Sequence, residues 1–329
     1  MEFYFATVGR GKIVSSFLSA ARYFDNFHLE AVYSRNAENG KEFAEKYGCN
    51  KVYTTLDEII ADEKINCVYV ASPNSLHCSQ TVALLRGGKN VLCEKPLCIT
   101  REQLDRVIQA SGQSKAQLGV CLQNRYNLAT LAAKQYLAGK TIAAAHGEVC
   151  WNRDENYYRQ GDWRGKWATE GGGVLINQAL HTLDLLQYLC GMPARVTAQC
   201  DNWYHKGVIE VEDVAAATFF GENGGNFDFF ATTTSAAELP AQLTIKTTDK
   251  HTVVILPDAA YADGQTLTFD PHGEYLSKCC YGKGHASLIP DFYDAVETGR
   301  RFDIDGAEGA KVVHMILAVY DSNGNEVNI

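Results

Sequence analysis

The sequence has no excess of positive charge. Its 329 residues include 30 lysines and arginines against 39 aspartates and glutamates, a net charge of −9 near neutral pH. A protein that binds DNA or RNA usually carries a basic stripe or patch, and this sequence shows none. The composition therefore argues against nucleic acid as a partner, whereas local basic residues can still bind a small anion.

Long apolar runs and a signal-like N-terminus are also missing. No apolar stretch approaches the roughly 18 residues of a membrane-spanning helix. The opening MEFYFATVGRGK has no basic segment followed by a long apolar one. We therefore expect a cytoplasmic protein with no membrane partner.

The cysteines lack the spacing of a metal site or a disulfide framework. There are 11 of them, an odd number, and none forms a C-x-x-C pair. Cys93 and Cys98 lie five residues apart, and Cys279 and Cys280 are adjacent, which is typical of neither zinc binding nor disulfides. We predict no metal, and we expect the cysteines to be small buried hydrophobes in a reducing compartment.

No repeat, low-complexity segment or Pro/Gly/Ser-rich linker divides the chain, although its length predicts about two domains. The first third alternates between strand and helix patterns. Strands are predicted at 3–8, 28–34, 67–72, 90–96 and 117–123, with helices near 12–24, 37–47, 74–86 and 100–111. This alternation predicts βαβ units and a doubly wound parallel sheet over residues 1–123.

The remainder, residues 124–329, predicts a second, α+β domain. Short β-rich segments fill residues 194–280, and turns such as ENGG at 222–225 separate them, as in antiparallel meanders. Helices are predicted near 126–138, 170–191, 286–298 and 307–320, with a strand at 146–151.

A glycine turn points to a dinucleotide. Gly9-Arg10-Gly11-Lys12-Ile13 follows the first predicted strand and opens a helix, the context in which glycines admit a pyrophosphate to a helix N-terminus. Val14 replaces the third small residue of that fingerprint.

The end of the second predicted strand bears on which dinucleotide is bound. Ser34 and Arg35 stand where an NAD site has a carboxylate, and Glu30 is near the wrong end of the strand. Because Ser and Arg can bind a 2′-phosphate, we favour NADP over NAD. The alternative is that Arg35 is a solvated side chain and NAD serves equally well.

Four motifs occur in order along the chain: Gly9-Arg-Gly11, Ser72-Pro73-Asn74 with His77, Gly88 to Glu94-Lys95-Pro96, and Gly171-Gly-Gly to Asn177, His181 and Asp184. Together they resemble the glucose–fructose oxidoreductase / inositol dehydrogenase / MocA (Gfo/Idh/MocA) family. The resemblance implies an N-terminal Rossmann domain and a C-terminal domain with a large, mostly antiparallel sheet. It also implies oxidation or reduction of a sugar, polyol or similar hydroxyl, in dimers or tetramers built through that sheet.

The glycine turn, the end of the second predicted strand and the resemblance together give the predicted nucleotide contacts. These are Gly9, Arg10, Gly11, Lys12, Ile13, Ser34, Arg35, Ser72, Pro73, Asn74, His77, Glu94, Lys95 and Arg125. Glu94 and Pro96 would position Lys95, whose bond to Pro96 we expect to be cis. His77 is expected at the helix start or beside the cofactor, and packing is an equal alternative for Arg125. Family members commonly have aspartate where this chain has Asn177, which removes a charge that could orient His181.

The chemistry of hydride transfer suggests roles for two residues. An alcohol that loses hydride must also lose a proton, and histidine titrates in the required range. We predict His181 as the general acid/base and Lys95 as the cation that stabilises the oxyanion.

Further expectations concern the second domain. Predicted substrate contacts are Lys95, Arg153, Tyr157, Tyr158, Trp163, Arg164, Trp167, Asn177 and His181, although the aromatic loop at 152–170 could instead be structural. We expect Gly171–Gly173 to leave room for cofactor or substrate at the helix start. Tyr188 is expected in the core, and Glu210, Glu212 and Asp213 in a solvated or strand-edge cluster.

Two other functions remain open at this point. Retained nicotinamide could support a redox-neutral glycosidase or epimerase, in which substrate turnover leaves nicotinamide absorbance unchanged. A non-catalytic dinucleotide-sensing protein is the third possibility, although the presence of both Lys95 and His181 argues against it.

Overall fold

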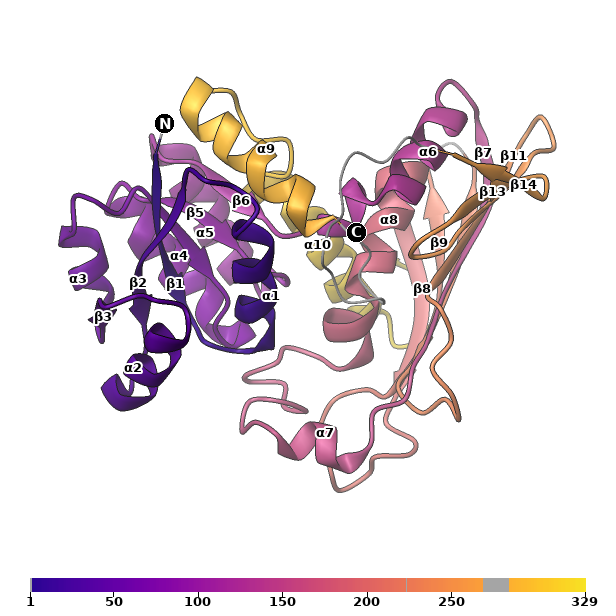
Figure 1. The fold of residues 1–329 in the computed structure, drawn as a ribbon. Helices are drawn as coiled ribbons and strands as arrows, with labels where there is room; N and C mark the ends of the chain where they lie inside the picture. The colour runs from indigo at the N-terminus through magenta and orange to yellow at the C-terminus, as the bar shows by residue number, and fades with distance from the viewer. Residues whose placement is uncertain (1, 223, 269–283) are drawn as a thin grey trace. The chain divides into compact units, whose positions relative to one another are not determined.

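A computed structural model describes residues 2–222, 224–268 and 284–329 of the chain (Figure 1). These residues form two compact units. The first comprises residues 2–122 together with His285–Ala310, and the second comprises residues 123–268, Gly284 and Lys311–Ile329. The chain therefore returns to the first unit after building most of the second.

The first unit is built on a six-stranded parallel sheet. Its order is β3-β2-β1-β4-β5-β6, which is that of a Rossmann fold. The strands are β1 (Phe3–Val8), β2 (Phe27–Tyr33), β3 (Val52–Tyr53), β4 (Cys67–Val70), β5 (Asn90–Cys93) and β6 (Leu118–Val120). β1 and β4 are almost wholly buried, as expected of central strands covered on both faces.

Five helices connect these strands. They are α1 (Lys12–Ala21), α2 (Ala37–Lys46), α3 (Leu56–Ala61), α4 (Asn74–Arg86) and α5 (Arg101–Gln113). Thr100 accepts a hydrogen bond from the Gln103 backbone at the start of α5, as its sequence motif predicts. A full capping box at Thr55 and Glu58 opens α3, which together with β3 was not predicted.

The returning segment completes the first unit with α9 (His285–Thr298) and the start of α10 (Gly306–Ser322). Gln117 at the head of β6 holds it by donating to the carbonyls of Ala295 and Arg300 and accepting from Phe302 N. Gly119 leaves space that Phe292 fills. The small residue and the amide of one short strand thus anchor a segment far away in sequence.

The second unit contains a nine-stranded sheet of order β14-β13-β12-β11-β7-β10-β9-β8-β15. β7 and β10 pair in parallel, and the other neighbouring strands pair antiparallel within the described residues. The strands are β7 (Ile142–Cys150), β8 (Pro193–Asp201), β9 (Val214–Gly221), β10 (Asn226–Thr232), β11 (Gln242–Thr247), β12 (Thr252–Ile255), β13 (Ala260–Ala262), β14 (Gln265–Leu267) and β15 (Val327–Asn328). The predicted large, mostly antiparallel sheet is confirmed.

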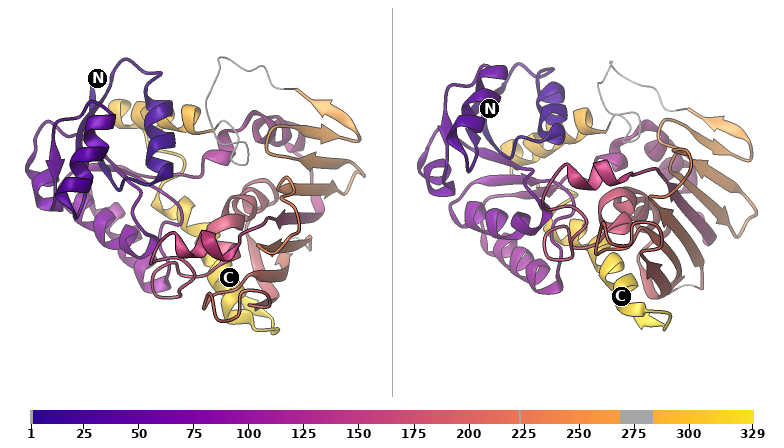
Figure 2. Two further views of the ribbon diagram at one scale, coloured as in Figure 1. Left: turned by 60° about the horizontal axis from the view of Figure 1, so that its bottom comes forward. Right: turned by 90° about the horizontal axis from the view of Figure 1, so that it is seen from below.

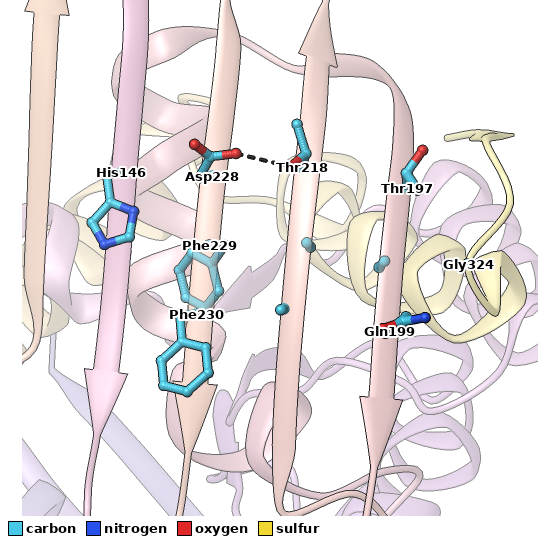
Figure 3. Close-up of a pocket in the computed structure, with 11 residues that line it drawn as sticks. His146, Thr197, Gln199, Thr218, Asp228, Phe229, Phe230 and Gly324 are labelled. Atoms are coloured by element: carbon cyan, nitrogen blue, oxygen red, sulfur yellow. Dashed lines mark hydrogen bonds between the residues drawn. The ribbon is translucent and has the colours of Figure 1, made fainter.

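Helices cover one face of this sheet, as Figure 2 shows for α8 (Leu180–Cys190). α6 (Leu128–Leu137) packs with it, and the short α7 (Glu155–Arg159) lies in the aromatic loop. The opposite face is open and carries a hollow of about 450 Å³. His146, Asp228 and Thr218 project from neighbouring strands there, and Thr218 donates to Asp228 (Figure 3).

The expectation that the cysteines are buried is met by most of those that the structure describes. All nine described cysteines are free, and six of them are buried. Cys279 and Cys280 lie outside the described residues. In the described part of the chain, no helix is both long and apolar enough to cross a bilayer.

Candidate functional site

The turn between β1 and α1 needs its two glycines for different reasons. Gly9 has φ +119°, and a side chain there would overlap the backbone oxygen of Ala71. A Cβ on Gly11 would meet no atom within 4 Å, so open space lies over the start of α1. No side chain of the described residues caps that helix at Gly11. Val14, the departure from the fingerprint, is fully buried. A cradle of this kind fits the pyrophosphate of a dinucleotide.

Two exposed arginines lie at this edge of the sheet. Arg10 follows β1 and Arg35 follows β2, and within the described residues neither forms an ion pair. Ser34 is buried, and its hydroxyl donates to Asn36 O. Glu30 is occupied elsewhere, because Lys51 and Lys64 lie 2.5 and 2.7 Å from its carboxylate. Ser34 and Arg35 thus stand at the end of β2 in place of an acid, and Glu30 does not serve instead because it is paired with two lysines.

His77 ties together the loops that follow β4 and β5. Its Nδ1 lies 2.7 Å from Pro96 O and its Nε2 lies 2.8 Å from Ser72 O. The Lys95–Pro96 peptide is cis, as expected. Burial lowers the pKa of His77, although both carbonyls act against the shift. The ring is buried and holds the backbone just before Asn74 and just after Lys95.

Glu94 is held in place by Tyr69, whose ring stacks on Phe17. The hydroxyl of Tyr69 donates to Glu94 Oε1 at 2.7 Å, and the ring of Tyr69 stacks on Phe17 with centroids 3.8 Å apart. The second carboxylate oxygen accepts from the backbone of Lys95, whose side chain is half-buried. β1, β2, β4 and β5 are adjacent and parallel, so the loops after them meet at one edge. The structure thus brings together all the predicted nucleotide contacts of the first unit.

Arg125, the remaining predicted nucleotide contact, lies in the second unit. Its guanidinium pairs with Asp184 through two hydrogen bonds of 2.8 and 2.6 Å, and both side chains are buried. It also lies 4.4 Å from the ring centroid of Tyr188. Tyr188 is half-buried between Arg125 and Lys134, so the expectation that it is a core residue is wrong.

The segment that carries His181 is not a regular helix from its start. Residues Leu175–Ala179 form a π-helical turn, and α8 then runs to Cys190, with Gly191 at φ +91° closing it as predicted. π-turns are frequent at functional sites. His181 is buried at the start of α8, where the side-chain amide nitrogen of Gln123 lies 3.3 Å from its Nε2. Gln123, which was not predicted, thus helps to orient the imidazole.

Tyr157 is the centre of a polar cluster around Asn177. Its hydroxyl accepts from Arg164, from Gln178 at 3.0 Å and from Asn177 at 3.4 Å. Asn177 also donates to the buried carboxylate of Glu170. Burial raises the pKa of Tyr157. Glu170, seven residues earlier in the chain, therefore places a carboxylate beside Asn177.

The other predicted substrate contacts are placed differently. Tyr158 is buried in a small core with Ile209 and Val211, and its hydroxyl donates to Thr233. Arg153 pairs with Glu238. Arg164 lies over the rings of Tyr157 and Trp163, with its Cζ 4.3 and 4.7 Å from their centroids. The cluster around Asn177 thus includes Tyr157 and Arg164 rather than Tyr158.

Two expectations about the entry to α8 are wrong. A side chain on Gly172 would overlap the Tyr320 hydroxyl, and one on Gly173 would overlap the backbone oxygen of Glu212. Protein atoms therefore fill the space predicted for a ligand there. Glu212 and Asp213 are buried rather than solvated. The apolar context VIEVEDVAAATFF was the available signal, since an acid that is buried among apolar residues must have partners.

Family models match both units of this architecture. The model of the oxidoreductase family with an NAD-binding Rossmann fold matches residues 3–122, and the model of the GFO/IDH/MocA C-terminal domain matches residues 132–252. The chain belongs to the Gfo/Idh/MocA family. The resemblance inferred from its motifs is confirmed.

Curated members of the family are similar over part of their length. The chain is 40% identical to the scyllo-inositol 2-dehydrogenase (NADP(+)) of Bacillus subtilis over 107 residues, which is 32% of this chain and 33% of that protein. It is 30% identical to the 1,5-anhydro-D-fructose reductase of Ensifer adhaerens over 186 residues, 55% of each chain. The matches thus span about a third to a half of these relatives.

Solved structures of the family match the whole chain. A levoglucosan dehydrogenase in complex with NADH superposes with a TM-score of 0.89 at 21% identity, over 100% of this chain and 99% of that one. The WlbA dehydrogenase of Bordetella pertussis, in complex with NADH and UDP-GlcNAcA, gives 0.87 at 24% identity, over 100% and 99%. At this identity the likeness establishes the shared fold.

Proposed function

We propose that the chain is an NAD(P)-dependent oxidoreductase that transfers a hydride between nicotinamide and a sugar, polyol or related hydroxyl or keto substrate. The carboxyl edge of the parallel sheet carries the proposal: open space over Gly11, exposed Arg10 and Arg35, and Lys95 after β5 lie on that edge. The names of the inositol dehydrogenase and anhydrofructose reductase relatives support the same class of reaction.

We assign the proton and the oxygen of the substrate to two residues. When bound, the nicotinamide accepts the hydride that leaves the alcohol carbon, or returns it in reduction. His181 takes the hydroxyl proton as the carbonyl forms, because imidazole titrates near neutral pH. Lys95 donates to the same oxygen and stabilises its developing negative charge. Glu94 and Gln123 position these two groups.

We favour NADP as the nucleotide. Ser34 and the exposed Arg35 replace the carboxylate that would repel a 2′-phosphate, and a guanidinium suits phosphate geometry. Tyr157, Arg164 and Asn177 are the polar groups that we assign to substrate hydroxyls, with Trp163 as a stacking surface.

Assembly through the open face of the nine-stranded sheet is part of the proposal. Apolar Phe230 and polar Asp228, Thr218 and Gln199 line the hollow there (Figure 3). We expect a homodimer or homotetramer in light scattering, and Phe230→Asp should shift it to smaller species. A monomer in the unaltered protein would contradict this part.

The decisive assay is a panel of sugars, polyols and keto-sugars with NADP(H) and NAD(H), followed by nicotinamide absorbance. Turnover that His181→Ala and Lys95→Ala reduce at least 100-fold, and that the exposed-site control Glu222→Gln leaves unchanged, supports the proposal. Full activity in both alanine variants would overturn the mechanism. Glycoside cleavage without net absorbance change would replace the dehydrogenase by a redox-neutral enzyme.

A further inference from the structure

A buried carboxylate lies at the entry to the segment that carries Asn177 and His181. Glu212 Oε2 accepts from Gly173 N at 2.8 Å, and Oε1 accepts from Leu175 N at 3.0 Å. The Glu212 backbone oxygen accepts from Val174 N at 3.1 Å. One residue thus satisfies three successive N–H groups that a helix start otherwise leaves without partners.

We propose that Glu212 is a positioning residue of the active site: its carboxylate fixes the glycine turn, and hence the start of the π-turn that carries Asn177 and leads to His181. The proposal rests on the function proposed for His181. Gly173 contributes to this arrangement, because any side chain there would push the turn away from Glu212. This close approach explains why glycine is needed at the turn.

The same residue is linked to the aromatic loop. Tyr320 from α10 donates to Glu212 Oε1 at 2.9 Å, and its ring meets that of Trp167 edge-on at 5.1 Å. Two residues earlier, Glu210 O accepts from the Trp167 indole at 3.0 Å. Residues 210–212 therefore brace both the loop at 165–167 and the turn at 173–175.

The ionised form of Glu212 is the one that fits these partners. All three groups directed at its carboxylate are donors, so a proton on either oxygen would oppose one of them. Burial raises the pKa of Glu212 to about 7, against the effect of these hydrogen bonds. The turn is therefore held most firmly above about pH 7 and loosens as Glu212 takes up a proton.

Few other ionisable groups face this carboxylate. Tyr320 lies on α10, Cys200 on β8 has a pKa raised by burial and by the Glu212 charge, and Glu170 precedes the turn. Asp213 is directed away, toward the His205 ring and three backbone N–H groups. The cysteine and the tyrosine stay neutral near pH 7, because both pKa values are raised, so neither adds a charge beside Glu212 there.

Amide hydrogen exchange tests the positioning role without substrate. At pH 8, Glu212→Gln should raise exchange of peptides spanning residues 173–181 at least ten-fold, while peptides of β1 and β4 stay unchanged. Tyr320→Phe, which keeps the ring and loses one donor, should give a smaller rise and serves if the first variant does not fold. Glu222→Gln is the exposed control. Unchanged exchange in both test variants would overturn the proposal.

Tryptophan fluorescence supplies a second readout, since Trp167 contacts the ring of Tyr320, whose hydroxyl donates to Glu212. The wild-type protein should show a transition near pH 7 that Glu212→Gln abolishes and that Trp167→Phe removes with its reporter. Tyr320→Phe should move the carboxyl titration upward, measured by carboxyl-carbon NMR. No titration of Glu212 between pH 6 and 8 would contradict the charge-dependent part.

Turnover separates this inference from the proposed function. With an active substrate, Glu212→Gln should lower kcat at least ten-fold at pH 8 with little change in nucleotide KM. A protein without any turnover, but with the exchange and titration results above, would refute the oxidoreductase proposal and leave the positioning of the turn intact. Turnover unaffected by Glu212→Gln would refute the positioning role alone.

Discussion

The nucleotide edge of the first unit and the His181 region of the second use charge in opposite ways. At the edge, Arg10 and Arg35 are exposed and open space lies over Gly11. Around His181, Arg125 is buried against Asp184, and Glu212 is buried against three donors. The nucleotide edge is built from backbone and exposed cations. The His181 region is built from buried polar groups that are paired with each other.

This difference predicts where substitutions act. Removing an exposed arginine changes little in the folded chain and should act on ligand affinity. Removing one partner of a buried pair leaves a charge without compensation, and should act on stability. Substitutions in the two regions therefore test this division.

Asp184→Asn should be the most destabilising change. It leaves the Arg125 guanidinium buried beside a neutral amide, at a cost of about 3–5 kcal/mol in the free energy of unfolding. Urea denaturation measures it. Glu326→Gln, which breaks the exposed pair with Arg195, is the control and should cost roughly 0–1 kcal/mol. Equal losses in the two variants would mean that burial does not separate these pairs.

Glu212 should make stability depend on pH in an unusual direction. Its pKa is raised from 4.5 to about 7 by burial, so the folded state holds its proton more tightly than the unfolded chain. This stabilisation is complete below about pH 4.5 and is lost as the pH rises through 7. It amounts to about 3 kcal/mol at 1.36 kcal/mol per pH unit.

Comparison with Glu212→Gln isolates that contribution. The difference in unfolding free energy between wild type and variant should change by about 3 kcal/mol between pH 4.5 and 8, in favour of wild type at the acidic end. A constant difference across this range would show that Glu212 titrates normally in the folded protein. The acid form is thus the more stable one, whereas the ionised form holds the turn, a conflict typical of functional sites.

A pair of glycine substitutions compares the two regions directly. Gly173→Ala forces a side chain onto the backbone of Glu212, and should cost about 2–3 kcal/mol of stability. Gly11→Ala enters open space at φ −73°, and should leave the melting temperature near that of wild type while weakening nucleotide binding. Calorimetry and nucleotide titration of both variants measure this. A destabilised Gly11→Ala would remove the contrast.

The sequence reveals the first unit more fully than the second because local patterns determine it. Each of β1, β4 and β5 is a short apolar run followed directly by its loop, so the order of motifs along the chain also places Gly9, Ser72 and Glu94 at one edge. The lack of an acid after β2 could be read in the same way, whereas the cis geometry at Lys95–Pro96 was expected from the position of that bond in the candidate site and not from a local pattern. The helix α9 was predicted, but its place in the first unit could not be, because no local pattern records that Gln117 binds residues 295–302.

Partners distant in sequence explain the misses in the second unit. Gly172 and Gly173 suggest a ligand only while Tyr320 and Glu212 are unknown neighbours. Tyr157 and Tyr158 are adjacent and chemically alike, and only the fold shows which one meets Asn177. Residue type and spacing predict that polar groups gather here, and packing decides which of them bind each other.

Arg35→Ala should have the smallest effect on the protein and a specific one on its ligand. The exposed side chain has no ion pair among the described residues, so the unfolding free energy should stay within about 0.5 kcal/mol of wild type. NADPH binding should weaken about ten-fold, equivalent to about 1.4 kcal/mol, because a charge-assisted bond to the 2′-phosphate is lost. NADH, which lacks that phosphate, should bind almost unchanged. Fluorescence titration with both nucleotides measures the difference, and Arg86→Ala, an exposed arginine at the far end of α4, is the control. Equal weakening for NADH and NADPH would mean that Arg35 contacts the shared part of the nucleotide, and the preference for NADP would then need another residue.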